Sequence, residues 1–342
     1  MLVRRRLQPN PKGCVQYHLW QTHVNTSPEP DHRPAPVQCA SAVLLVQPAH
    51  FAFNPQTAGS NRLASPASGA AAPNLAALAE FEALHQALRA VGVRCCVVQD
   101  TALPPKPDAI FPNNWLSFHA DGSLVLYPLH APNRRAERRA EILAAVQQEL
   151  GFRERRRLDL SDREQQGRFL EGTGSLVLDH VGRIAFASRS VRTEESLVQE
   201  WAAWIGYEPV VFDSCGLDGQ PLYHTNVLVS IGARHAVVCS AALSLKDRGR
   251  VLERLRASGR TIVDISIDAL YGFGANILEL QVPVPGGRPT GVLVLSARAR
   301  AALAPAEWEP LRAAVDRVIE VSVPTIETLG GGGVRCMMAE VP

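Results

Sequence analysis

A run of four glycines at residues 330–333 is followed three positions later by Cys336, and this is the most distinctive chemical feature of the chain. Glycine has no Cβ, so such a run can follow backbone paths closed to other residues and can pass close to a ligand. A thiol carried at its end is a candidate nucleophile. The Lys-Ser/Thr pair that completes a phosphate-binding loop is missing, so nucleotide binding is not indicated. Taken alone, the segment could equally be a loose terminal linker with an inert cysteine.

His224 and Glu171 could manage the proton of such a thiol. His224 directly precedes the apolar run of residues 227–229, and a histidine at a strand edge can act as general acid and base at neutral pH. Glu171 lies between an apolar lead-in and a glycine-containing turn, where a carboxylate can orient a substrate N–H group. Each residue by itself is more often structural, as a satisfied histidine or a turn residue in solvent.

The other cysteines are poorer candidates for a nucleophile. Cys95, Cys96 and Cys239 lie in valine-rich runs and are expected to pack as small core residues, whereas Cys215 lies in a polar loop and is a weak competitor. The count of seven is odd and no Cys-x-x-Cys spacing occurs, so neither a disulfide framework nor a zinc site is indicated. The sequence therefore predicts a reducing, cytoplasmic setting and an activity without a metal or other cofactor.

Five helical stripes of apolar residues recur roughly every 60 residues and could position these groups. Short β-rich runs lie between them, such as residues 124–127, 175–178 and 226–229. The spacing favours five α/β modules in a closed ring, with the site where the modules meet. An open α/β sheet with evenly spaced helices is the alternative that periodicity alone does not exclude. The stripes are Leu75, Leu78, Phe81, Leu84 and Leu88; Ile142, Val146 and Leu150; Leu197, Trp201 and Trp204; Val251, Leu252 and Leu255; and Leu311, Val315 and Val318.

The composition is that of an ordinary globular chain of 342 residues, 46% of them apolar and 20% charged, which excludes disorder throughout. Its 35 basic and 33 acidic side chains leave a net charge of +2, so no nucleic-acid or anionic-membrane partner is indicated. No apolar stretch approaches the roughly 20 residues that span a bilayer, and no secretory signal follows the basic start. Residues 1–38 carry six prolines and no apolar period, so we expect a disordered extension before a single domain of residues 39–342.

Three motifs along the chain resemble those of arginine deiminases and their superfamily. Residues 331–337, Gly-Gly-Gly-Val-Arg-Cys-Met, closely resemble the C-terminal nucleophile motif of arginine deiminases. Residues 169–172, Phe-Leu-Glu-Gly, and residues 190–193, Ser-Val-Arg-Thr, are similar to the Glu-Gly-Gly-Asp and Ser-x-Arg-Thr segments of the same superfamily. Together they resemble the guanidino-group-modifying, or pentein, superfamily, which also includes amidinotransferases.

Further segments resemble individual branches of this superfamily. Residues 131–135, Ala-Pro-Asn-Arg-Arg, are similar to a turn-to-helix segment of dimethylarginine dimethylaminohydrolases. Residues 46–61 and 108–115 strongly resemble the arginine-deiminase-related citrulline-utilisation hydrolases. The resemblance runs from about residue 39 to the end of the chain, and it implies the superfamily's fivefold pseudosymmetric α/β propeller, in agreement with the repeat found independently.

The resemblance also implies roles for particular residues. Cys336, His224 and Glu171 match the superfamily's catalytic residues, and Arg192 matches the arginine that binds the substrate α-carboxylate. His224 would protonate the departing nitrogen and later activate the hydrolytic water, while Glu171 would help to hold the planar substrate head. Asp108 is expected to orient its loop or the substrate amine.

Two positions depart from the arginine-deiminase pattern. Those enzymes hold the guanidinium cation with two aspartates, and here the matching positions are Asn114, with Asn113 as a competing alignment, and Asn226. Two buried carboxylates suit a cation, whereas an uncharged urea would leave them uncompensated at a cost of several kcal/mol. An asparagine amide offers both a donor and an acceptor to a ureido group. Gly174 also stands where the superfamily motif often has an aspartate, which removes a further negative group.

The sequence therefore predicts a hydrolase that acts on a C–N bond of a free ureido amino acid, most simply citrulline, giving ornithine, ammonia and carbon dioxide. An arginine deiminase or methylarginine hydrolase, an amidinotransferase, and a non-catalytic propeller like the ribosome anti-association factors are the alternatives. The expected partner is a small amino-acid substrate, and association with a second copy of the chain is left open.

Overall fold

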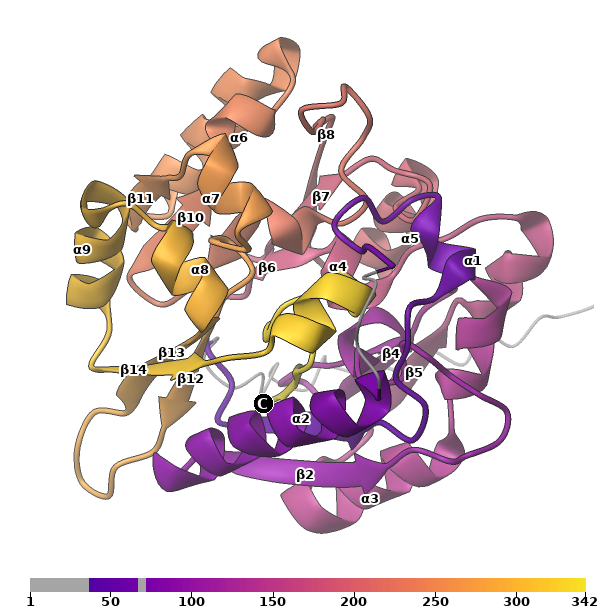
Figure 1. Cartoon of the computed structure of the whole chain (residues 1–342). Coiled ribbons are helices and arrows are strands. Elements are labelled where there is room, and N and C mark those ends of the chain that lie inside the picture. The colour runs from indigo at the N-terminus through magenta and orange to yellow at the C-terminus, as the bar shows by residue number, and fades with distance from the viewer. Residues whose placement is uncertain (1–36, 67–71) are drawn as a thin grey trace, which may run out of the picture. The chain divides into compact units, whose positions relative to one another are not determined.

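Five small sheets of the same plan make up the part of the chain that the structure describes. The structure is a computed structural model that describes residues 37–66 and 72–342. In each sheet a central strand pairs antiparallel with one neighbour, here called the inner strand, and parallel with the other, the outer strand. In the order inner, central, outer, the sheets are β15 (Ala339–Val341), β1 (Ala42–Gln47), β2 (Arg94–Gln99); β3 (Leu116–Phe118), β4 (Ser123–Leu126), β5 (Arg156–Asp159); β6 (Val177–Asp179), β7 (Ile184–Ser188), β8 (Glu208–Phe212); β9 (Val229–Ile231), β10 (His235–Val238), β11 (Thr261–Asp264); and β12 (Leu278–Val282), β13 (Thr290–Ser296), β14 (Arg317–Val321) (Figure 1).

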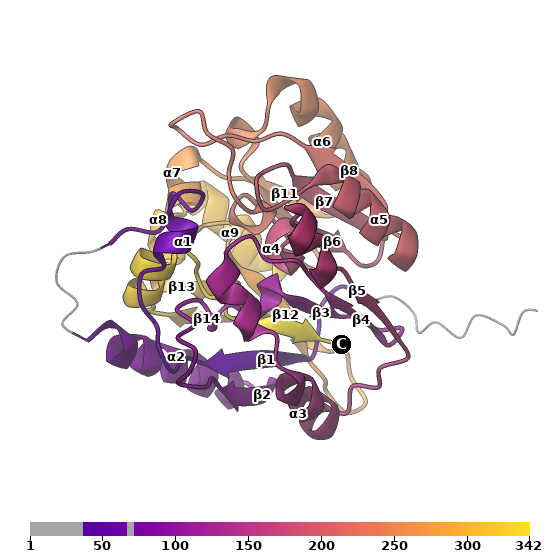
Figure 2. The ribbon, with the colours of Figure 1, turned by 90° about the vertical axis from the view of Figure 1, so that its right-hand side faces the viewer.

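Helices join the central strand to the outer strand in every sheet, as the parallel pairing of those two strands requires. In Figure 2, α2 and α3 lie beside β2, and both helices contact that strand. The five sequence repeats are therefore βαβ units, each with one added antiparallel strand, as expected for a fivefold α/β propeller. The connecting helices are α2 (Pro73–Ala90), α3 (Ala140–Leu150), α5 (Glu195–Ile205), α6 (Leu245–Ala257) and the pair α8 (Ala297–Ala302) and α9 (Pro305–Ala314).

The apolar stripes mark the buried faces of these helices, with two differences from expectation. Phe81, Leu84 and Leu88 of α2 are almost fully buried, but Leu75 is 69% exposed, so the first stripe begins later than predicted. The fifth stripe crosses an element boundary, because α9 ends at Ala314 and Val318 lies in β14. No helix within residues 37–66 or 72–342 combines the length and the apolar character needed to cross a bilayer.

The last strand in the sequence completes the first sheet. β15 pairs antiparallel with β1, with Ala42 opposite Val341 and Leu44 opposite Ala339. β15 also contacts β3 of the second sheet, and β9 contacts both β6 and β12. The inner strands therefore adjoin one another, and the turns that lead into them are gathered together.

Short helical turns precede several inner strands and correct two predicted strand starts. Ser175 belongs to a helical turn, so β6 begins only at Val177, and Asn226 lies in a 3₁₀ turn, so β9 begins at Val229. His224 therefore leads into a turn rather than directly into a strand. The short elements are α1 (Pro55–Ala58), η1 (Pro112–Asn114), η2 (Pro132–Glu137), η3 (Ser161–Gln166), α4 (Gly172–Ser175), η4 (Thr225–Val227), η5 (Ser240–Ala242), α7 (Ile267–Tyr271) and η6 (Ile326–Gly330).

Gln38 belongs to the folded domain rather than to the predicted extension of residues 1–38. Its side chain is 7% exposed, donates to the backbone oxygens of Leu178 and Ile231, and accepts the backbone N–H of His180. The predicted boundary is therefore too late in the sequence. Residues 1–36, for which disorder was predicted, lie outside the described residues.

Candidate active site

Five turns, each leading into an inner strand, supply side chains to one site. Each turn places one residue two positions before a buried leucine or methionine that packs in the core. The repeated local sequence thus sets five equivalent positions, one from each sheet. These positions, each with its apolar anchor, are Asn114 (Leu116), Gly174 (Leu176), Asn226 (Leu228), Asn276 (Leu278) and Cys336 (Met338).

Cys336 ends a loop that is packed rather than loose. Residues 330–333 are all buried. A Cβ atom at Gly330 would lie 2.7 Å from the Phe111 ring, and one at Gly331, where φ is +63°, would lie 2.6 Å from the backbone nitrogen of Ala64. Larger residues would therefore push the loop away from its neighbours. The alternative of a loose terminal linker is wrong, and the thiol is 4% exposed in a defined place.

Glu171 and His224 form a buried hydrogen-bonded pair. The His224 Nε2 atom lies 2.9 Å from Oε2 of Glu171, whose Oε1 accepts the backbone N–H of His130 at 2.9 Å. A carboxylate only accepts, so Nε2 carries the proton of the neutral imidazole. Nδ1 is consequently the ring nitrogen that can take a proton from a reacting group. Glu171 contacts the opposite ring nitrogen, Nε2, and does not line the pocket.

Arg192 reaches the same pocket from the loop after β7. Its guanidinium donates to the hydroxyl of Ser60 at 2.9 and 2.7 Å and to the backbone oxygen of Thr57 at 3.1 Å. Its Nη1 lies 3.5 Å from Oε2 of Glu171. The side chain is therefore held in place by the α1 segment, with its charge next to the Glu171 carboxylate.

Asp108 is bound to the α1 segment as well. Its Oδ2 accepts the side-chain N–H of Asn54 at 2.7 Å and lies 3.8 Å from Nε of Arg134. These contacts agree with a loop-orienting role for Asp108, and its carboxylate also lines the pocket.

Arg134 fixes the orientation of the Asn114 amide. Its guanidinium pairs with both carboxylate oxygens of Glu137, at 2.9 and 3.0 Å, and its Nη1 donates to Asn114 at 2.9 Å. Arginine has no acceptor, so the Asn114 atom that faces it must be Oδ1. Nδ2 must then point away from Arg134, where one N–H reaches Oδ1 of Asn113 at 3.2 Å. Asn114 lines the pocket, whereas Asn113 does not line it and instead accepts the side-chain N–H of Asn114.

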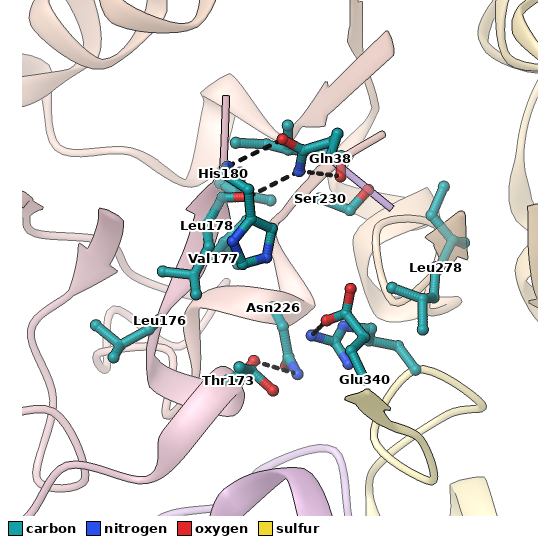
Figure 3. A pocket seen from close by; sticks show the side chains of 14 residues that line it. Gln38, Thr173, Leu176, Val177, Leu178, His180, Asn226, Ser230, Leu278 and Glu340 are labelled. Carbon is teal, nitrogen blue, oxygen red and sulfur yellow. Dashed lines mark hydrogen bonds and ion pairs between the residues drawn. The ribbon is translucent and has the colours of Figure 1, made fainter. Parts of the chain in front are cut away.

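Asn226 lies against the sulfur instead of facing the pocket as predicted. Its Nδ2 donates to the Thr173 backbone oxygen at 3.2 Å and lies 3.6 Å from Sγ of Cys336. The same residue lines a second cavity, together with Gln38 and His180 (Figure 3). The two asparagines that were predicted to hold the substrate head thus have different surroundings: Asn114 lines the pocket, and Asn226 contacts the sulfur of Cys336.

Gly174 allows the closest approach of the site residues. A Cβ atom there would lie 2.7 Å from Nδ1 and Cε1 of His224 and 2.7 Å from Nδ2 of Asn114. The aspartate that often stands at this position in the superfamily motif has no room in this arrangement. The glycine therefore acts through its size, in addition to the missing negative charge.

Burial keeps the thiol and the imidazole neutral in the free site. It raises the pKa of Cys336, in spite of the hydrogen bond from Asn276, and it lowers the pKa of His224 to about 4, in spite of Glu171. Burial also opposes ionisation of Glu171, but Arg192 and the hydrogen bond from His224 outweigh it and hold the pKa of this carboxyl below its usual range. Both groups are therefore uncharged in the free site at neutral pH.

The pocket joins Cys336 and His224 with three of the predicted substrate-binding residues. Within residues 37–66 and 72–342, no group of three His, Cys, Asp or Glu side chains is placed to hold a metal ion. The lining is mostly polar. It consists of Asn61, Asp108, Phe111, Asn114, Arg134, Arg192, Tyr223, His224, Gly330, Gly331, Gly332 and Cys336.

Several residues at this site were not among the predicted site residues, and two of them contact predicted ones. Asn276 contacts the sulfur of Cys336, and Arg134 orients Asn114. A signal for Asn276 was present, because the pattern Phe-x-x-Asn followed directly by an apolar pair occurs twice, at residues 111–114 and 273–276. Arg134 lies in the segment of residues 131–135 that resembles dimethylarginine dimethylaminohydrolases, but that resemblance gave it no role and did not distinguish it from Arg135.

The fold and the position of the site define the class of protein, and solved structures of 15–20% identity confirm the fold. The N-terminal domain of ArgZ, an arginine dihydrolase from the ornithine–ammonia cycle in cyanobacteria, bound to its substrate, has 19% identity and a TM-score of 0.63, with 88% of this chain and 97% of that chain covered. Unliganded AgrE has 18% identity and a TM-score of 0.63, with 88% and 39% covered. A dimethylarginine dimethylaminohydrolase adduct with S-methyl-L-thiocitrulline has 15% identity and a TM-score of 0.57, with 88% and 100% covered. The protein has the pentein fold.

The family follows from a match to the sequence itself. The family model described as N,N dimethylarginine dimethylhydrolase, eukaryotic, matches residues 47–342, and the chain belongs to this family. The predicted membership of the guanidino-group-modifying superfamily is thereby confirmed, and the chain belongs to a family of enzymes that hydrolyse C–N bonds. No curated protein matches the chain.

Proposed function

We propose that this protein is a thiol-dependent hydrolase that cleaves a C–N bond of citrulline, with ornithine, ammonia and carbon dioxide as products. The observation that carries the proposal is the orientation of Asn114. With Oδ1 committed to Arg134, the free N–H of Nδ2 is a donor at the pocket. A donor suits the carbonyl oxygen of a ureido group, whereas a guanidinium offers only donors of its own.

The charges around the pocket support a neutral substrate head. Asp108 lies 3.8 Å from Arg134, and Glu171 lies 3.5 Å from Arg192. Each of these two carboxylates thus has an arginine partner, and a substrate cation placed between them would also approach two guanidinium groups. A ureido group brings no charge and leaves both ion pairs intact.

The proposed reaction uses one thiol and one imidazole in two half-reactions. Sγ of Cys336 gives its proton to Nδ1 of His224 and bonds to the ureido carbon, and the C–N bond breaks as the imidazolium returns that proton to the departing nitrogen. Water then attacks the thiocarbamoyl carbon, His224 takes its proton, and the C–S bond breaks to restore the thiol. The carbamic acid that is released decomposes to an amine and carbon dioxide, so one water is consumed for each citrulline.

The remaining residues hold the substrate. The paired Glu171 keeps the imidazole in the tautomer whose Nδ1 is unprotonated. Arg192 is suited to an α-carboxylate because it is buried, always charged and anchored to Ser60 and Thr57. Asp108, in the same pocket, is suited to the substrate α-amine.

The test is a direct comparison of substrates with the purified full-length chain. Citrulline, arginine and asymmetric dimethylarginine are supplied separately, and ornithine, citrulline, dimethylamine and ammonia are measured over time. The proposal expects the largest kcat/KM for citrulline, with ornithine and ammonia formed in equal amounts. Accumulation of citrulline from arginine, or a failure to consume citrulline, would overturn it.

Hydrolysis of arginine or of a methylated arginine is the second candidate, and the family match favours it. In that case arginine or dimethylarginine has the largest kcat/KM and citrulline is either the end product or an intermediate. The same time course separates these outcomes, because a deiminase stops at citrulline and a dihydrolase continues to ornithine with two ammonia molecules.

A further inference from the structure

Every hydrogen-bonding group of the buried Asn276 amide has a partner. Its Oδ1 accepts the Gly333 backbone N–H at 3.1 Å, and its Nδ2 lies 3.3 Å both from the backbone oxygen of Asn226 and from Sγ of Cys336. A backbone N–H only donates and a backbone carbonyl only accepts, so these two partners fix which end of the amide faces which way. The second N–H of Nδ2 is left for the sulfur.

This contact has its greatest effect when the sulfur is charged. A neutral thiol is a weak acceptor, whereas a hydrogen bond to an ionised acceptor is roughly twice as strong as one between neutral groups. A bond that strengthens as the thiolate forms lowers the free energy of the attacking state more than that of the resting thiol. The Asn276 amide is therefore matched to the reactive form of Cys336.

The arginines near Cys336 provide little stabilisation of its thiolate, because each of them lies beside a carboxylate. Arg335, its neighbour in the sequence, pairs with Glu340 at 2.9 Å, and Arg134 and Arg192 lie beside Glu137 and Glu171. A neutral citrulline would bring no positive charge of its own. Fixed dipoles must then supply most of the stabilisation, and the Asn276 amide has the shortest donor contact with the sulfur.

We propose that Asn276 is a catalytic residue: its Nδ2–H donates to the sulfur of Cys336 and stabilises the thiolate that attacks the substrate. It is the counterpart, in the β12–β13–β14 sheet, of Asn114 and Asn226 in their own sheets. The proposal rests on the nucleophilic role of Cys336 in the proposed function. A purely structural role, as an anchor for Gly333, is the alternative that the experiment must separate.

The test measures the reactivity of Cys336 in the full-length chain. Iodoacetamide alkylates thiolates, and trypsin releases a peptide that begins at Cys336, so mass spectrometry follows this cysteine apart from the others. Asn276→Asp keeps an oxygen for the Gly333 N–H but faces the sulfur with a negative oxygen. We expect the pH midpoint of alkylation to rise by at least about one unit, so that the rate at pH 8 falls about tenfold. kcat should fall by a similar factor, with KM changed less than about threefold, because Asn276 does not line the pocket.

Two further variants keep the proposal falsifiable. Asn276→Ala removes both contacts, and it should also raise the alkylation midpoint, which covers the case in which the Asp variant does not fold. Asn61→Ala is the matched control, because Asn61 Nδ2 anchors the same loop through the Gly330 oxygen at 2.9 Å without touching the sulfur. Its midpoint should equal that of the unchanged protein.

An unchanged midpoint in both folded Asn276 variants, or an equal rise in Asn61→Ala, would show that the amide only holds the loop. The result is independent of the substrate. The unchanged protein could fail to consume citrulline while the alkylation midpoint of Cys336 still depends on Asn276. In that case the proposed function is wrong, and the proposed contact of Asn276 with the thiolate is still supported.

Discussion

Changing Asn114 to aspartate tests whether this amide selects a neutral substrate. The new carboxylate keeps one oxygen for Arg134, at the 2.9 Å position that Oδ1 now occupies. The other oxygen replaces Nδ2 and faces Asn113, whose own Nδ2 has no partner and can turn to donate to it. The fold should therefore tolerate Asn114→Asp, while the pocket loses its donor.

The expected effect on citrulline is large. As sulfur attacks the ureido carbon, the carbonyl oxygen becomes negative, and Nδ2–H of Asn114 is the donor available to it. Removal of one such donor typically costs about 100-fold to 1,000-fold in kcat, or about 2.7–4 kcal/mol of transition-state stabilisation. Asn114→Asp also puts a negative oxygen in the place of Nδ2, where it repels the developing negative charge, so the loss of kcat should be at least as large. Arginine does not use the donor, so its kcat/KM relative to that of citrulline should rise by at least about 100-fold.

The assay is the measurement of ornithine, citrulline and ammonia at several concentrations of each substrate, for the unchanged protein and the variant. Gln148→Glu is the matched control, because it makes the same change of charge at an exposed position of α3. It should leave the substrate ratio unchanged. If the unchanged protein prefers arginine, or if Asn114→Asp leaves the ratio where it was, the argument from amide orientation is refuted.

Four other outcomes are expected. Cys336→Ser should reduce turnover below detection without loss of fold, because a hydroxyl cannot replace the thiolate. Cys215→Ser, at an exposed position, should leave turnover nearly unchanged. The reverse pattern in the substrate assay would show that Cys336 is not the nucleophile. Gly174→Ala should lower kcat at least about tenfold, because its Cβ would lie 2.7 Å from the catalytic imidazole, and a kinetic comparison checks this. Gln38→Ala should lower the free energy of unfolding by about 1–3 kcal/mol in denaturant titrations, since it leaves buried backbone groups unpaired. Burial lowers the pKa of His119 from 6.5 to about 3, so the unfolded chain takes up this proton first. This histidine alone should lower stability by up to about 1.4 kcal/mol per pH unit as pH drops from 6.5 towards 3, in addition to other buried histidines such as His224. Thermal unfolding at pH 7, 6 and 5 checks the slope, and His119→Gln should reduce it by up to that amount.

The repeat and the order of the motifs could be read from the sequence because they depend on local patterns. The stripe that contains Phe81, Leu84 and Leu88 follows the helical period, and it predicted a buried helical face that the structure confirms. The glycine run before Cys336 has no use in a regular helix or strand, so it pointed to a special loop. The catalytic roles of Cys336, His224 and Glu171 stay predictions, although the structure brings these residues together.

The orientation of the side chains at the site could not be predicted from such local patterns. Asn114 and Asn226 have the same residue type and equivalent places in the repeat, yet one lines the pocket and the other contacts the sulfur, because Arg134 and Thr173 hold their amides. Arg134 lies 20 residues from Asn114 and Thr173 lies 53 residues from Asn226, so the local sequence does not show these partners. Gln38 was likewise assigned to the extension because residues 1–38 are rich in proline and carry no apolar period, while its hydrogen bonds are to residues such as Leu178, far along the chain.

The pairing of β15 with β1 has a consequence for how the enzyme matures. The ribosome synthesises β1 first and β15 only after all the strands between them. The edge of β1 that pairs with β15 is therefore unpaired while the rest of the domain is synthesised. Cys336 lies three residues before β15 and reaches its place only when this last strand docks. The pocket of the nascent chain therefore lacks Cys336, and an exposed strand edge is open to unwanted pairing during that interval. Activity should appear in a single step, as ring closure both protects the edge and delivers the thiol.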